Sequence, residues 1–135
     1  RMERHCTNAL AVAKWLDADP RVSWVSFPGL ETDKYHALAE KYMPNGTCGV
    51  ISFGVPGGRE KVSAFLDHLK MVSIATHVAD ARSCTLYPAG TTHRQLTEEQ
   101  LEEAGVGIDL VRLSCGIENT ADIIADLDQA LAAVQ

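Results

Sequence analysis

Arg112 is the side chain whose type and position most directly suggest a chemical role. It lies in a run of alternating residues, 109–115, that predicts a strand, and it shares one face of that strand with Leu110 and Ser114. A permanent cation beside core residues must be solvated, paired or kept for an anionic ligand, and a guanidinium group matches a carboxylate in bidentate geometry. From the residues alone, an arginine on a solvated face of the sheet is the simpler interpretation, and a carboxylate site is the alternative.

The histidines and cysteines show no spacing that is typical of a metal site. They are His5, His36, His68, His77, His93, Cys6, Cys48, Cys84 and Cys115. None forms an H-x-x-x-H or C-x-x-C pair, so the sequence predicts no metal centre. We expect reduced thiols, as in a cytoplasmic protein. A nucleophilic cysteine–histidine pair stays open, because such pairs meet in space rather than along the chain.

Length and composition predict one domain, residues 1–135. The chain has 46% hydrophobic and 22% charged residues, which is ordinary for a globular protein. The net charge of -6 argues against a nucleic-acid partner, since phosphate binding needs a basic face. No apolar run is long enough to span a membrane. Because no hydrophobic segment follows the charged residues at the start, we expect no signal peptide. Because position 1 is not an initiator Met, we expect a cut inside a longer protein.

The periodicity of hydrophobic residues predicts the helices and strands that position these side chains. A first helix is expected up to about Leu16, and a third around residues 62–69. A second helix is expected to begin after Thr32 as its N-cap, with one apolar face formed by Tyr35, Leu38, Ala39 and Tyr42. Two more are expected from a capping box at Thr97–Gln100 and from Asn119 onward. Strands are expected at residues 22–27, 48–55, 71–75, 83–87 and 109–115. Residues 54–58 are expected to form a turn between a strand and a helix. This order predicts an α/β (α+β) fold with helices on one face of a sheet.

Three stretches resemble one enzyme family. The segment 86–93, LYPAGTTH, resembles a family segment HPAS-x-TH, and 104–118 looks like a signature that ends in Arg-Leu-Ser-x-Gly-Ile-Glu. Asn8-Ala9 with Val12-Ala13, and 24–30, are similar to the start of the family's small domain. The family is that of the Cys/Met-metabolism pyridoxal-phosphate enzymes of fold type I. Residues 1–10 favour the branch that acts on O-acetylhomoserine and sulfide.

The resemblance implies that the chain is the small C-terminal domain, with a mixed or antiparallel sheet. The family's cofactor-binding lysine follows a Ser-x-Thr motif in a large domain, and no lysine here has that context. Pyridoxal 5'-phosphate and the catalytic residues are therefore expected outside this chain, which alone should be inactive. The intact enzyme would be a cytoplasmic homo-oligomer, such as a tetramer. It would eliminate acetate from O-acetylhomoserine and add sulfide to give homocysteine, a transferase step of methionine biosynthesis.

The resemblance also assigns substrate-binding positions. Arg112 falls on the family's anchor for the substrate α-carboxylate, and Thr92 on a position that lines the substrate pocket. His77 falls where the family usually has Ser or Asn beside that carboxylate, so this chain departs from the family's pattern at that contact. Tyr87 and Gly90 replace the usual His and Ser of the HPAS segment, and both are expected to be structural.

Two alternatives stay open. One is a related reaction of the same family, that of a methionine γ-lyase or a cystathionine γ-synthase, because the discriminating residues would lie in the other domain. The other is a free-standing ligand-binding module of ferredoxin-like type.

Overall fold

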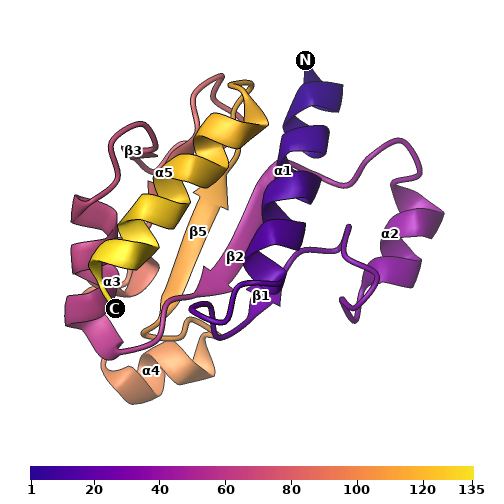
Figure 1. Ribbon diagram of the computed structural model, residues 1–135. Coiled ribbons are helices and arrows are strands. Elements are labelled where there is room, and N and C mark those ends of the chain that lie inside the picture. The colour runs from indigo at the N-terminus through magenta and orange to yellow at the C-terminus, as the bar shows by residue number, and fades with distance from the viewer.

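Five strands form one mixed sheet in the computed structural model, which describes residues 1–135 (Figure 1). The strands are β1 (Val25–Ser26), β2 (Val50–Gly54), β3 (Ser73–Ile74), β4 (Cys84–Leu86) and β5 (Leu110–Ser114), in the spatial order β1-β2-β5-β4-β3. Three of the four pairings are antiparallel, and only β3 runs parallel to its neighbour β4. The last strand of the sequence is thus the central strand of the sheet.

Three helices cover one face of this sheet. They are α1 (Met2–Asp17), α3 (Gly58–Asp67) and α5 (Thr120–Ala133), and Figure 1 shows α1 and α5 side by side in front of β2 and β5. Ile51 and Phe53 of β2 are fully buried beneath them, and the Phe53 ring meets that of Phe65 in α3 edge to face at 6.1 Å. Each such side chain contributes about 1.5–3 kcal/mol through burial. The predicted fold class, with helices on one face of a sheet, is confirmed.

Local sequence signals set several helix ends as predicted. Thr97 and Gln100 form a full capping box at α4 (Glu98–Glu103), with Gln100 N–H donating to Thr97 Oγ1 and Thr97 N–H to Gln100 Oε1. Asn119 caps α5 by accepting a hydrogen bond from the N–H of Ala121 at 2.9 Å. Residues 54–58 form the expected turn, in which Gly57 has a φ of 112° that favours glycine. None of the helices is long and apolar enough to cross a lipid bilayer.

Two expectations for residues 22–42 are wrong. The strand expected at 22–27 is reduced to β1, because the Phe27 N–H turns to the carboxylate of Asp33 at 3.0 Å. The helix α2 (His36–Tyr42) begins after Tyr35 and not at Thr32, since Asp33 also accepts from the Tyr35 N–H and holds 33–35 in a turn. Of the apolar face that was expected there, only Ala39 is buried.

Candidate functional site

Arg112 lies at the middle of β5, on the face of the sheet that the helices leave uncovered. Its strand neighbours Val111 and Leu113 are fully buried on the helix face, so alternation along the strand forces Arg112 to the other side. There it pairs in register with Ser52 of β2 and Leu86 of β4. The predicted alternation at 109–115 is confirmed, and the guanidinium stands on a rigid central strand.

The charge of Arg112 has no counterion in this chain. Its side chain is partly exposed, and one Nη2 N–H donates to the backbone carbonyl of Thr76 at 3.1 Å. Arg21 and Arg82 are each paired with aspartates, whereas no carboxylate lies within ion-pair distance of Arg112. A guanidinium carries five N–H donors. The remaining donors of Arg112 can therefore bind a carboxylate in bidentate geometry.

The segment that orients Arg112 runs across the same side of the sheet. The N–H of Ala75 donates to the carbonyl of Thr85 at 3.0 Å, and the N–H of Ala79 donates to Ser114 Oγ at 3.1 Å. Ser114 belongs to the strand face that also carries Arg112. Thr76 is thus held between two fixed points, and its carbonyl presents a fixed acceptor to the guanidinium.

His77 follows directly after the residue that contacts Arg112. Its side chain is exposed and makes no hydrogen bond. It lies close to Asp80, whose pKa is lowered mainly by the N–H of Arg82, with a smaller contribution from the imidazole. The structure therefore brings His77 into the neighbourhood of Arg112 without a direct contact between the two side chains.

Thr92 lies in an exposed loop after β4 and the short 3-10 helix η1 (Pro88–Gly90). Its hydroxyl lies 2.8 Å from Nδ1 of the adjacent His93. No hydrogen bond joins Thr92 to Arg112 or to His77. The hydrogen bonds of this chain therefore do not link Thr92 to the other two residues of the predicted site.

The two departures from the family's HPAS pattern depend on each other. The hydroxyl of the buried Tyr87 donates to the carbonyl of Ile108 at 2.7 Å, and burial raises the pKa of this phenol. A Cβ atom at Gly90 would lie only 2.5 Å from the Tyr87 ring. A tyrosine at position 87 therefore requires a glycine at position 90, and the two exchanges amount to one structural change.

A buried polar network, which the sequence did not reveal as such, fixes the turn after β5. The Glu118 carboxylate accepts from the N–H and the hydroxyl of Ser83 at 2.6 and 2.9 Å, and Ser83 Oγ accepts from the N–H of Gly116 at 2.9 Å. The fully buried Asn8 donates to the carbonyls of Gly116 and Glu118 at 3.0 and 2.9 Å. The available signal was a polar residue on the apolar face of a helix. This network explains the Gly-Ile-Glu end of the signature and its partner Asn8.

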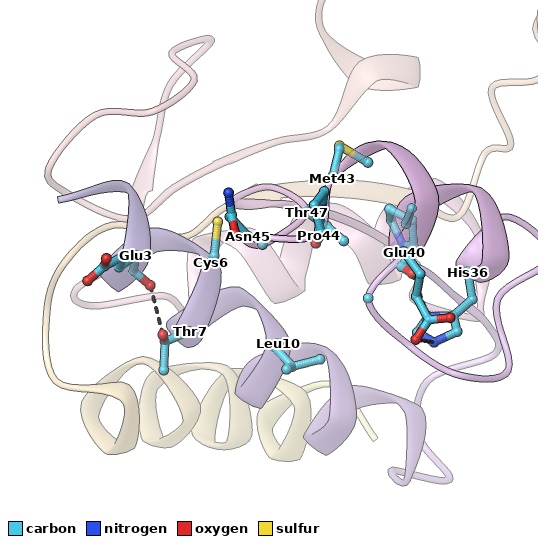
Figure 2. A pocket seen from close by; sticks show the side chains of 14 residues that line it. Glu3, Cys6, Thr7, Leu10, His36, Glu40, Met43, Pro44, Asn45 and Thr47 are labelled. Carbon is cyan, nitrogen blue, oxygen red and sulfur yellow. Dashed lines mark hydrogen bonds and ion pairs between the residues drawn. The ribbon is translucent and has the colours of Figure 1, made fainter.

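A cleft of about 680 Å³ lies away from Arg112, between α1 and α2 (Figure 2). Cys6 and Leu10 of α1 line one side of it, and His36, Glu40 and Met43 line the other. The Cys6 thiol is partly exposed here, and burial together with nearby Cys48 raises its pKa. A raised pKa lowers the thiolate fraction and with it the nucleophilicity of Cys6. No pattern in the sequence indicated this cleft.

Nearly the whole chain is similar in sequence to known proteins. It is 50% identical over 131 residues to a homocysteine synthase of Schizosaccharomyces pombe, and 47% identical over 132 residues to an O-acetyl-L-homoserine sulfhydrylase of Leptospira meyeri. These alignments cover 97% of the chain but only 30% of each relative. The chain therefore spans about a third of the length of the curated relatives that it matches.

The fold of the chain also matches part of a longer solved structure. A crystal structure of an O-acetylhomoserine (thiol)-lyase from Campylobacter jejuni, which contains a pyridoxyl-lysine monophosphate, matches with a TM-score of 0.90 and 38% identity. The match covers 98% of this chain and 31% of that one. The family model described as Cys/Met metabolism PLP-dependent enzyme matches residues 1–132. The chain therefore belongs to the family of pyridoxal-phosphate-dependent enzymes of cysteine and methionine metabolism.

Proposed function

We propose that this chain is the C-terminal domain of a pyridoxal-phosphate-dependent O-acetylhomoserine sulfhydrylase, in which Arg112 binds the α-carboxylate of the substrate. The carrying observation is a partly exposed guanidinium at the centre of the sheet, oriented by Thr76 and left without a counterion. Such a group binds a planar carboxylate with two parallel hydrogen bonds. The names of the relatives support O-acetylhomoserine as the molecule that carries this carboxylate.

The complete enzyme would replace the acetate group of O-acetylhomoserine by sulfide, which gives homocysteine and acetate. In this reaction Arg112 holds the amino-acid end of the substrate, so that the carbon chain has one orientation. Thr76 restricts the guanidinium through a single N–H and leaves the others to the ligand. We propose His77 and Thr92 as further substrate-binding residues. His77 is adjacent to Thr76, and Thr92 would reach the substrate from its exposed loop in the assembled enzyme.

The residues of this chain do not fit a pyridoxal-phosphate site. Four of the five lysines, Lys14, Lys34, Lys41 and Lys70, are exposed, and Lys61 donates its ammonium to the carbonyl of Val134. None of the lysine side chains forms a hydrogen bond with Arg112 or with Thr76, the residue that orients it. This supports a large domain outside residues 1–135 that would bind the cofactor and supply the lysine. We further propose that the complete enzyme is a cytoplasmic homo-oligomer. The chain by itself would then be inactive.

The test is the Arg112→Ala variant of the full-length enzyme, assayed with O-acetylhomoserine and sulfide. Loss of the carboxylate anchor should raise KM for O-acetylhomoserine far more than KM for sulfide, because sulfide has no carboxylate. Unchanged kinetics would remove Arg112 from the site. A wild-type enzyme that releases methanethiol from methionine, or condenses cysteine with its substrate, and ignores sulfide would instead identify the methionine γ-lyase or cystathionine γ-synthase reaction.

A further inference from the structure

A short segment, residues 75–79, carries the carbonyl that orients Arg112. Its first and last N–H groups donate to neighbouring strands, to the carbonyl of Thr85 in β4 at 3.0 Å and to Ser114 Oγ in β5 at 3.1 Å. The N–H groups of residues 76–78 donate to no acceptor in this chain, and these three residues are exposed. The path of the segment across the sheet therefore depends on the contacts at its two ends.

Ala79, at the second of these ends, has a backbone conformation that alanine rarely adopts. Its φ of 59° lies in the left-handed region, and every other residue with a positive φ is a glycine. In this conformation the Cβ atom crowds the following carbonyl oxygen, so it persists only where surrounding contacts hold it. The contact that holds Ala79 is its hydrogen bond to Ser114.

Ser114 has the properties of a fixed support. It is only 1% exposed, and it follows Arg112 by two residues on the same face of β5, the central strand of the sheet. One rigid strand thus carries both the guanidinium and the support of the segment that orients it. A change of backbone conformation at Ala79 would move the Thr76 carbonyl relative to that guanidinium.

A buried serine can also serve stability alone, and Ser83 is an example in this chain. Its hydroxyl accepts from the N–H of Gly116 at 2.9 Å and bonds to none of residues 75–79. Ser114 differs because the N–H that it accepts belongs to the segment that supplies the only hydrogen-bond partner of the Arg112 guanidinium.

We infer that Ser114 is a positioning residue for the substrate-carboxylate site, and that it acts through Ala79 on Arg112. This inference rests on the proposed function, in which Arg112 binds the α-carboxylate. The Ser114 hydroxyl holds Ala79 in its strained conformation, and this keeps the Thr76 carbonyl in place. Without that hydroxyl the segment relaxes, and the guanidinium spends less time in the orientation that binds a carboxylate with two parallel hydrogen bonds.

The test is steady-state kinetics of full-length variants, with KM for O-acetylhomoserine, KM for sulfide and kcat determined separately. Ser114→Ala should raise KM for O-acetylhomoserine by about three- to tenfold, the range expected for loss of one neutral hydrogen bond, and should leave KM for sulfide unchanged. Ser83→Ala is the matched control, because it also removes a buried hydroxyl that accepts a backbone N–H. Its KM for O-acetylhomoserine should equal that of the wild type. An unchanged KM in Ser114→Ala, or equal increases in both variants, would overturn the inference.

A double-mutant cycle with Arg112→Ala shows whether Ser114 acts through the guanidinium. In the Arg112→Ala background, Ser114→Ala should change KM for O-acetylhomoserine no further. A second increase as large as that in the wild-type background would overturn the inference, since Ser114 would then act independently of Arg112. If Arg112→Ala alone leaves KM unchanged, the proposed function fails and the inference fails with it. If Arg112→Ala raises KM and Ser114→Ala does not, only the inference about Ser114 fails.

Amide hydrogen exchange of the full-length enzyme gives a measurement that does not depend on activity. The Ala79 N–H loses its acceptor in Ser114→Ala, so peptides that cover residues 76–79 should exchange faster than in the wild type. The same peptides of Ser83→Ala should exchange as in the wild type. Unchanged exchange of residues 76–79 in Ser114→Ala would show that the serine does not hold the segment, and would overturn the inference whatever the kinetics.

Discussion

The carboxylate of Asp126 in α5 accepts a hydrogen bond from the backbone N–H of Val72 at 2.8 Å. The two preceding N–H groups of segment 70–72 donate to the same carboxylate at 2.9 Å, and the residue is only 6% exposed. This segment leads into β3 and then to Thr76, whose carbonyl orients Arg112. The Asp126 carboxylate, in the helix layer, thus fixes the start of the segment whose Thr76 carbonyl binds Arg112 on the opposite face of the sheet.

This contact predicts an acid-sensitive contribution to stability. Burial by itself would raise the pKa of Asp126, but the N–H groups of 70–72 outweigh it and the net shift is downward. Because the pKa is lower in the folded state, the contribution is complete above the ordinary value of about 3.9 and is lost as the pH falls through the folded-state value. Asp126→Asn should lower the free energy of unfolding by about 2 kcal/mol at pH 7.

Urea denaturation at pH 7 and pH 3 measures this effect, and the gap between wild type and Asp126→Asn should narrow at pH 3. Asp128→Asn is the control on the same helix. Asp128 is exposed and paired only with Arg21, so its loss should cost less than about 1 kcal/mol. A gap that is equally wide at both pH values would show that the charge of Asp126 does not matter.

Substitutions of Arg112 should show whether substrate binding needs only a positive charge at this position or also the planar guanidinium group. In the full-length enzyme, Arg112→Ala should lower kcat/KM by roughly 10²- to 10⁴-fold, which corresponds to about 3–5 kcal/mol for a broken desolvated charge pair. Arg112→Lys should restore only part of this, since an ammonium lacks the planar fork that matches a carboxylate. Steady-state kinetics with O-acetylhomoserine would decide. Full recovery with lysine would show that only the charge is required.

The role of His77 should appear in the pH dependence of substrate binding. A neutral imidazole can donate one hydrogen bond to the carboxylate, and a protonated one adds a cation. KM for O-acetylhomoserine should therefore fall when the imidazole becomes protonated at lower pH, and His77→Asn should abolish this dependence. Coinciding KM profiles for the two enzymes, in shape and level, would mean that His77 has no role at the carboxylate.

The buried network around Asn8 should be costly to break. Asn8→Ala removes the donor for the carbonyls of Gly116 and Glu118 and the acceptor for the Thr120 hydroxyl, and should lower the free energy of unfolding by about 2–3 kcal/mol. The adjacent Thr7→Ala is the control, because Thr7 is exposed and bonds only within its own helix; its effect should stay within about 0.5 kcal/mol. Thermal or urea unfolding measures both. Equal losses would show that the network adds nothing to the turn after β5.

Addition of pyridoxal phosphate to the isolated 135-residue chain tests whether this chain can bind the cofactor without the rest of the enzyme. Its lysines are exposed or bonded to backbone, so we expect no stable visible absorption band beyond that of the free cofactor. Visible spectroscopy with single lysine variants is sufficient. A stable band that disappears when one particular lysine is replaced would place a cofactor site in this chain.

Local patterns predicted those parts of the fold that depend on neighbouring residues. The capping box of Thr97 and Gln100 is formed by residues three apart, and the alternation around Arg112 is a property of any strand. Both were readable from the sequence. The buried faces of α1, α3 and α5 followed from helical periodicity in the same way.

The remaining features depend on contacts between distant segments. Thr32 has the right type for an N-cap, but Asp33 takes the neighbouring N–H groups and delays α2. Asp126 lies at a core-facing position of α5, and the three backbone N–H groups that bind its carboxylate are more than fifty residues away. The acceptor for Arg112 is a backbone carbonyl, which no residue type at position 76 can signal. In each case the decisive partner becomes visible only in three dimensions.

The central position of β5 has a consequence for how this chain reaches its native state. The ribosome releases β1 to β4 before it releases β5, yet β2 and β4 meet only through that strand. Until residues 110–114 emerge, the nascent chain carries two separate half-sheets with unpaired edges, and such edges readily pair with other chains. Co-translational chaperone binding should therefore be strongest for nascent chains that stop between β4 and β5, and should decline once α5 can close over the completed sheet.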